Sequence, residues 1–148
     1  MARRGGTVRP GILDGVTVQQ NLDFVASVVD RWNSGEWFIP GAYDPELVWL
    51  PHRSVTEGAY RGIDGIQRFA EDTREHFERF ELGYELLDLG EERLLAWGTV
   101  HFRARHSGIE SEIPFGGLVT LRGGKILRWE DFGSKAAALE AAERGEKD

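Results

Sequence analysis

The feature that most constrains the fold of this chain is a run of four strand-like segments in its second half. The segments cover residues 80–89, 93–106, 109–121 and 125–132, and every gap between them is short and contains glycine. Short gaps of this kind are typical of β-hairpins, so the four segments are predicted to pair as antiparallel neighbours. Glycines inside the strands, at positions 98, 116 and 117, would allow the resulting sheet to bend sharply.

Two helical patterns precede these strands. Thr17 and Gln20 form a capping box at the start of the first pattern, which ends before Gly35. The second pattern spans residues 63–80, with an apolar stripe on one side and charge on the other. A short helix within 36–43 and a short buried strand at 47–50 are predicted between the two.

The order of these patterns predicts the fold class. Helices followed by a long antiparallel sheet indicate one α+β domain, here residues 17–144, with the helices on one face of the sheet. Residues 1–16 are predicted to be a flexible arm, and Ser134 is predicted to cap a final helix.

Composition and charge limit the possible partners. The net charge is −7 and the basic residues do not cluster, which argues against binding to nucleic acid. Without cysteine, there can be no disulfide or thiolate site. No apolar run approaches the roughly 20 residues of a membrane span, and no apolar segment follows the basic N-terminus, so we expect a cytoplasmic protein that does not contact membranes.

Four stretches of the chain resemble the SnoaL-like and nuclear transport factor 2-like superfamily. They cover residues 32–36, 43–48, 60–66 and 124–132, and the last is most similar to limonene-epoxide hydrolase and polyketide-cyclase relatives. The resemblance implies a cone-like barrel, in which a curved antiparallel sheet wraps around the N-terminal helices and encloses a deep pocket.

The catalytic residues of these relatives are only partly kept. Val28 and Gly117 stand where the resemblance would place the tyrosine and aspartate of ketosteroid isomerase. The last-strand aspartate of epoxide hydrolase matches Asp131, but Thr99 and His101 replace its arginine and second aspartate. The pattern of SnoaL-type cyclases, which depend on a single pocket carboxylate, is contradicted least.

Asp131 is the strongest catalytic candidate. Strand alternation places it on one face with Leu127 and Trp129, where a carboxylate would lose hydration and become suited to proton transfer. His101 shares a strand face with Arg103, and the resemblance implies that this face lines the pocket. The alternatives are that Asp131 caps the final helix or pairs with an arginine, and that His101 is a structural histidine.

His52 and Arg103 are further candidates, as groups that polarise a developing oxyanion. His52, His101 and Asp131 also have the composition of a metal triad, but no spacing motif supports one, and neither a metal nor a cofactor is predicted. A mostly apolar pocket lining is predicted, suited to flat hydrophobic molecules, formed by Trp49, Trp97, Trp129, Ile113 and Phe115.

Two functions follow from these patterns. The first is an acid/base enzyme of cyclase, isomerase or hydrolase type that acts on a small hydrophobic molecule, with Asp131 and His101 as partners. The alternative is a non-catalytic domain of the same fold that binds a small ligand or dimerises. A homodimer through the outer face of the sheet is also predicted, because Val100, Phe102 and Ala104 are assigned to that face.

Overall fold

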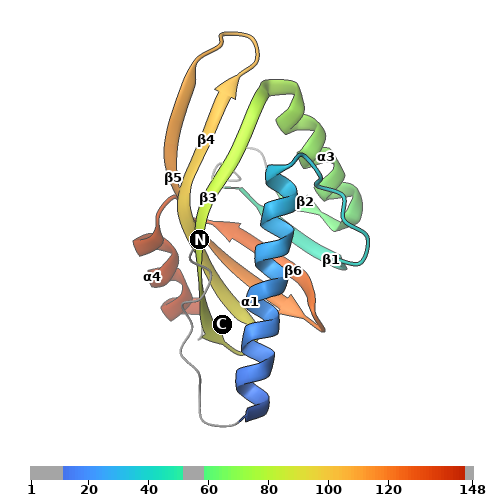
Figure 1. Ribbon diagram of the computed structural model, residues 1–148, viewed down its shortest axis with the longest axis vertical. Coiled ribbons are helices and arrows are strands. Elements are labelled where there is room, and N and C mark those ends of the chain that lie inside the picture. Colours follow the sequence, from blue (N-terminus) through green and yellow to red (C-terminus); the bar gives the residue numbers. More distant parts are fainter. Residues whose placement is uncertain (1–11, 52–58, 146–148) are drawn as a thin grey trace.

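The computed structural model describes residues 12–51 and 59–145 of the chain. In chain order, the elements are α1 (Ile12–Asn33), β1 (Tyr43–Leu50), β2 (Tyr60–Arg61), α3 (Gly62–His76), β3 (Phe77–Gly90), β4 (Arg93–Ala104), β5 (Glu110–Arg122), β6 (Lys125–Asp131) and α4 (Lys135–Gly145) (Figure 1). No helix within the described residues is long and apolar enough to cross a membrane.

The strands form one curved, six-stranded sheet in the order β2-β1-β6-β5-β4-β3. The predicted antiparallel pairing of β3, β4, β5 and β6 is confirmed. The sheet is nevertheless mixed, because β1 pairs with β6 in parallel. It is also open rather than closed into a barrel, since β2 and β3 are its two edges.

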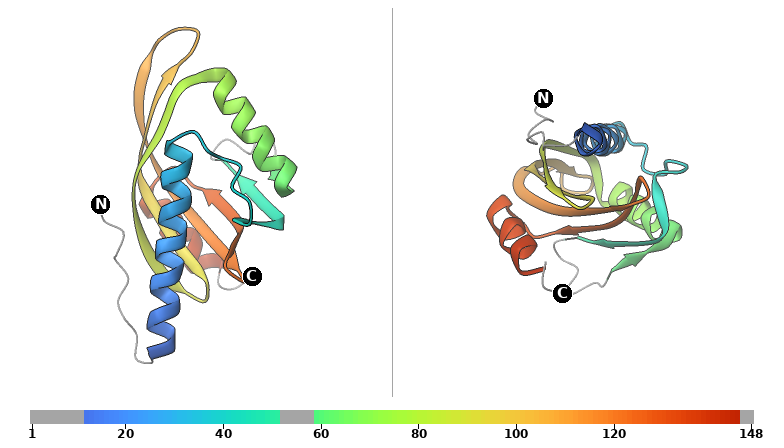
Figure 2. Two further views of the ribbon diagram at one scale, coloured as in Figure 1. Left: turned by 45° about the vertical axis from the view of Figure 1, so that its right-hand side comes forward. Right: turned by 90° about the horizontal axis from the view of Figure 1, so that it is seen from below.

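Helices cover both faces of the sheet. On the concave face, α1 and α3 pack over the strands, whereas α4 lies against the convex face (Figures 1 and 2). The main core lies between the concave face and the first two of these helices, and includes Val29, Ile66, Val100, Val119 and Ile126.

Three local predictions are wrong. The first helix begins at Ile12 rather than Thr17. Residues 36–42 contain no helix, and Trp37 and Ile39 are instead buried as alternate residues of an irregular connection. The second helix ends at His76, because the chain becomes extended at Phe77 and continues directly into β3.

The predicted cap of the final helix is confirmed. The Ser134 hydroxyl oxygen accepts a hydrogen bond from the backbone N–H of Ala137 at 3.1 Å, and α4 begins at the next residue, Lys135. Gly116 makes this turn possible, because a Cβ there would lie 2.0 Å from the Ser134 carbonyl oxygen. This close approach holds the start of α4 against β5.

Candidate functional site

The two faces of β4 are the reverse of the sequence interpretation. Val100 is buried in the core and Phe102 packs against it, so both belong to the concave face. Trp97, His101 and Arg103 alternate with them and therefore lie on the convex face. The apolar patch from which the homodimer was predicted is thus not on the outer face; the homodimer itself stays a prediction.

A cluster of aromatic rings fills the middle of the concave side. Trp32 stacks on Trp37 with ring centroids 4.9 Å apart, and Trp49 stacks on Trp129 at 5.3 Å. Edge contacts join the two pairs, and Phe69 packs against both Trp37 and Trp49. We call these five residues the tryptophan cluster.

The tryptophan cluster was only partly predicted. Trp49 and Trp129 were assigned to the pocket lining, but Trp32, Trp37 and Phe69 were not. Trp32 and Phe69 lie on the apolar stripes of their helices, so helical spacing does place them in the core. Nothing in the spacing places Trp37 there, because it lies in the irregular connection after α1.

Asp131 lies at the end of β6, opposite Gly117 of β5. Its Oδ1 accepts hydrogen bonds from the backbone N–H groups of Gly116 at 3.1 Å and Gly133 at 3.2 Å. The first bond continues the β5–β6 ladder past the last strand residue, and the second closes the turn towards α4. These contacts match the alternative interpretation, in which the side chain caps local structure.

His101 lies on the convex face, between Glu81 of β3 and Glu112 of β5 in register. Its Nδ1 is 3.0 Å from Oε2 of Glu112, and its side chain is 40% exposed. The ring also lies over Gly83, where a Cβ would be 3.8 Å from Nε2. Because Gly83 has no side chain, the imidazole of His101 can lie over this part of β3.

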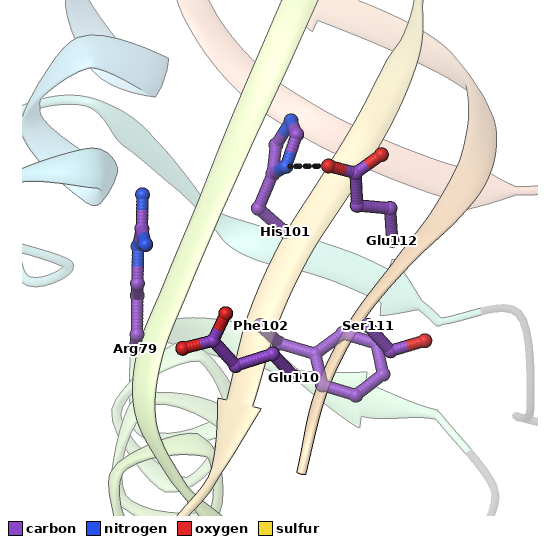
Figure 3. A pocket seen from close by; sticks show the side chains of 6 residues that line it. All are labelled: Arg79, His101, Phe102, Glu110, Ser111 and Glu112. Atoms are coloured by element: carbon purple, nitrogen blue, oxygen red, sulfur yellow. Dashed lines mark ion pairs between the residues drawn. The ribbon is translucent and has the colours of Figure 1, made fainter.

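His101 belongs to a depression of about 380 Å³ that is formed by residues of β3, β4 and β5 (Figure 3). Arg103 lies nearby on the same face and pairs with Glu78 at 3.4 Å and with Glu110 at 3.2 Å. The described lining is mainly polar and comprises Arg79, His101, Phe102, Glu110, Ser111 and Glu112. It is therefore not the apolar pocket that the sequence predicts.

The structure does not bring Asp131 and His101 together. Asp131 pairs in register with Gly117 of β5, and Gly117 pairs with Ala96 of β4. His101 lies five residues further along β4 than Ala96. At about 3.3 Å per residue, the two side chains are separated by about 16 Å along the sheet, and they belong to opposite faces. The predicted acid/base pair is therefore not formed.

The remaining candidates have separate locations. His52 lies outside the described residues. Trp97, predicted to line the pocket, is on the convex face, where the Lys135 ammonium lies 4.1 Å from its ring centroid. Within the described ranges, no group of three His, Asp or Glu side chains could hold a metal ion.

The concave face has one exposed apolar position among the predicted lining residues. Ile113 of β5 pairs with Val100 of β4, so the two share the concave face. Its neighbour on that face, Phe115, is 4% exposed, whereas Ile113 is 48% exposed. We call the part of the concave face around Ile113, beyond the end of β6, the open end.

Gly117 connects the open end to the tryptophan cluster. It follows Phe115 on the concave face of β5, and a Cβ there would lie 2.7 Å from Nε1 of Trp129. The missing side chain makes room for the Trp129 indole, which stacks on Trp49. Ile113, Phe115 and Gly117 thus form one row on the concave face of β5, and this row reaches the tryptophan cluster at Trp129.

Comparison with solved structures shows the fold of the SnoaL-like and nuclear transport factor 2-like superfamily. An NTF2-like protein of unknown function from Burkholderia pseudomallei K96243 matches with a TM-score of 0.68 and 20% identity, over 82% of this chain and 95% of that one. TerC, co-crystallised with polyporic acid, matches with the same TM-score and identity, over 84% and 98% of the two chains.

A third similar structure is a candidate SnoaL-like polyketide cyclase from Jannaschia sp. CCS1, with a TM-score of 0.63 and 20% identity. That match covers 84% of this chain and 91% of the cyclase. No protein-family model and no curated protein matches the chain by sequence. The structural similarity establishes a shared fold, but identities of 20% do not extend to function. The function therefore has to be argued from the site.

Proposed function

We propose that this chain is a small-molecule-binding domain whose ligand enters the concave side at the open end. The observation that carries the proposal is the 48% exposure of Ile113 on the same face of β5 as the buried Phe115 and Val119. An apolar concave surface with few polar groups is typical of sites for small hydrophobic ligands.

Two further observations support binding rather than the predicted acid/base pair. His101, the proposed partner of Asp131, is on the convex face in an exposed ion pair with Glu112. TerC, which shares the fold, was crystallised with a small organic molecule, polyporic acid. This chain shares that fold and offers an apolar side chain, Ile113, at the exposed end of its concave face.

Binding can be tested with acetylnaphthalene, a flat apolar probe, in a titration followed by NMR chemical shifts. We expect saturable shifts of residues on the concave side, and at least tenfold weaker binding for Ile113→Asp, because a carboxylate would have to be desolvated under the ligand. The control is Ile109→Asp, an exposed position at the hairpin tip about 13 Å along the strand. Absence of saturable shifts in the wild-type protein would refute the proposal.

Proton transfer by Asp131 is a second candidate function. The specific observation in its favour is that Asp131 follows Trp129 on the concave face and lies opposite Gly117, within the proposed ligand path. A carboxylate there could remove a proton next to a ligand carbonyl. The test is exchange of the acetyl methyl protons of the probe into deuterated water, which wild-type protein should accelerate and Asp131→Asn should not.

A further inference from the structure

Trp49 is the central ring of the tryptophan cluster. Its ring centroid lies 5.1 Å from those of Trp32 and Phe69, 5.3 Å from that of Trp129 and 6.4 Å from that of Trp37. The side chain is 5% exposed. Any polar atom of this indole is therefore removed from water.

The indole N–H of Trp49 has no hydrogen-bond partner among the described residues. The neighbouring Trp32 differs, because its Nε1 donates to the Tyr43 hydroxyl at 2.8 Å, and that hydroxyl in turn donates to the Trp37 carbonyl. A buried donor left unpaired costs about 1–3 kcal/mol, and such groups in folded proteins are generally found to have a partner. The N–H of Trp49 is thus a donor that a bound molecule can satisfy.

We infer that the Trp49 N–H is the polar anchor of the ligand site, and that it binds an uncharged oxygen acceptor on a flat, apolar molecule. This inference rests on the proposed function and names its ligand class. An indole N–H only donates, so the ligand must supply an acceptor such as a ketone, quinone or ether oxygen. The surrounding rings favour a flat hydrocarbon body, because they offer faces and edges for stacking.

The surroundings also argue against a charged ligand. All the rings in contact with Trp49 are neutral, and Trp129 and Phe69 supply no charge that could balance an anion or a cation. A charge buried among them would be costly, whereas a carbonyl oxygen requires only one donor. The Trp49 and Trp129 rings are in contact in this structure, so a ligand oxygen that reaches the Trp49 N–H has to move these rings apart.

The experiment compares acetylnaphthalene with ethylnaphthalene, which has a similar shape but no acceptor. In wild-type protein, the ketone should bind about five- to tenfold more tightly than the hydrocarbon, the worth of one hydrogen bond. The Trp49 indole N–H resonance should move downfield with the ketone and not with the hydrocarbon. Trp49→Phe should remove the preference, while Trp97→Phe, the control on the convex face, should keep it.

The outcomes separate the inference from the proposed function. If both probes bind with equal affinity, or if the ketone binds without moving the Trp49 resonance, the anchor is refuted and the binding function stands. If neither probe binds, both proposals are refuted. The resonance shift is measured on the wild-type protein, so the test does not depend on the variants being folded.

Discussion

The side-chain amide of Asn33, the last residue of α1, pairs with both backbone groups of Leu82 in β3. Its Nδ2 donates to the Leu82 carbonyl at 2.9 Å, and its Oδ1 accepts from the Leu82 N–H at 2.8 Å. Since β3 is an edge strand, the amide takes the place of a neighbouring strand at this point. Asn33 therefore fixes the end of α1 to the free edge of the sheet.

This pairing predicts that Asn33→Ala lowers the free energy of unfolding by about 1–3 kcal/mol, because two part-buried backbone groups lose their partner. Asn33→Asp should be at least as harmful at neutral pH, since a carboxylate cannot donate to the Leu82 carbonyl. Urea unfolding measures both effects. The neighbouring Ser34→Ala is the control, because its hydroxyl is exposed and donates to the nearby Arg31 carbonyl; equal stability of all three variants would contradict the role of Asn33.

A second prediction concerns the ion pair between Asp44 of β1 and Arg122 of β5. The guanidinium donates to both carboxylate oxygens of Asp44, at 3.0 and 2.9 Å, and also to Glu46. The hydrogen bonds from Arg122 lower the pKa of Asp44 below its ordinary value of 3.8. The folded state therefore binds the Asp44 proton more weakly than the unfolded state does, and the pair stabilises the fold above about pH 4.

We expect Arg122→Ala to be less stable than wild type at pH 7, and the difference to shrink as the pH falls below about 4, where Asp44 becomes protonated. Urea unfolding at a series of pH values measures this. The control is Arg128→Ala, which removes an exposed pair with Glu130 and should have a small effect. A stability difference between Arg122→Ala and wild type that stays constant down to pH 2 would contradict the prediction.

How much of this fold can be predicted from the sequence depends on how far apart in the sequence the interacting residues lie. The antiparallel pairing of β3, β4, β5 and β6 was predictable because each of the three turns is short and has a glycine within it or at the end of the preceding strand. The parallel pairing of β1 with β6 was not, since nothing within either strand specifies a partner 80 or more residues away. The helix end was misplaced because Phe77 and Phe80 fit helical spacing as well as they fit a strand.

The candidate site was harder to predict than the fold. Alternation divides β4 into two faces, but it does not say which face is concave, and the resemblance suggested the wrong one. On β6 a register shift between Thr120 and Leu121 of the partner strand interrupts the alternation, so Ile126 and Trp129 are both core residues. Such bulges depend on pairing with a neighbouring strand, which the pattern of one strand does not reveal.

A third prediction tests the close approach between β5 and the turn before α4. Gly116→Ala should lower the free energy of unfolding by about 1–3 kcal/mol, because the new Cβ would meet backbone atoms of Ser134 that cannot rotate away. Gly83→Ala is the matched control, since a Cβ there finds its nearest neighbours at 3.8 Å. Chemical denaturation of the two variants should separate them clearly, and equal midpoints would refute the proposed contact.

The last prediction distinguishes the structural role of Asp131 from the catalytic one. Asp131→Ala removes the acceptor of the Gly116 and Gly133 N–H groups, so it should lower the free energy of unfolding by about 1–2 kcal/mol. Asp131→Asn keeps an Oδ1 in the same place and should lose less, through the weaker bonds of a neutral acceptor. A desolvated acid/base carboxylate behaves differently, because replacing a costly buried charge by Asn holds or raises stability. Thermal melting of the three proteins decides the matter: a melting order of wild type, then Asn, then Ala supports the cap, whereas Asn above wild type would favour proton transfer as the role of this residue.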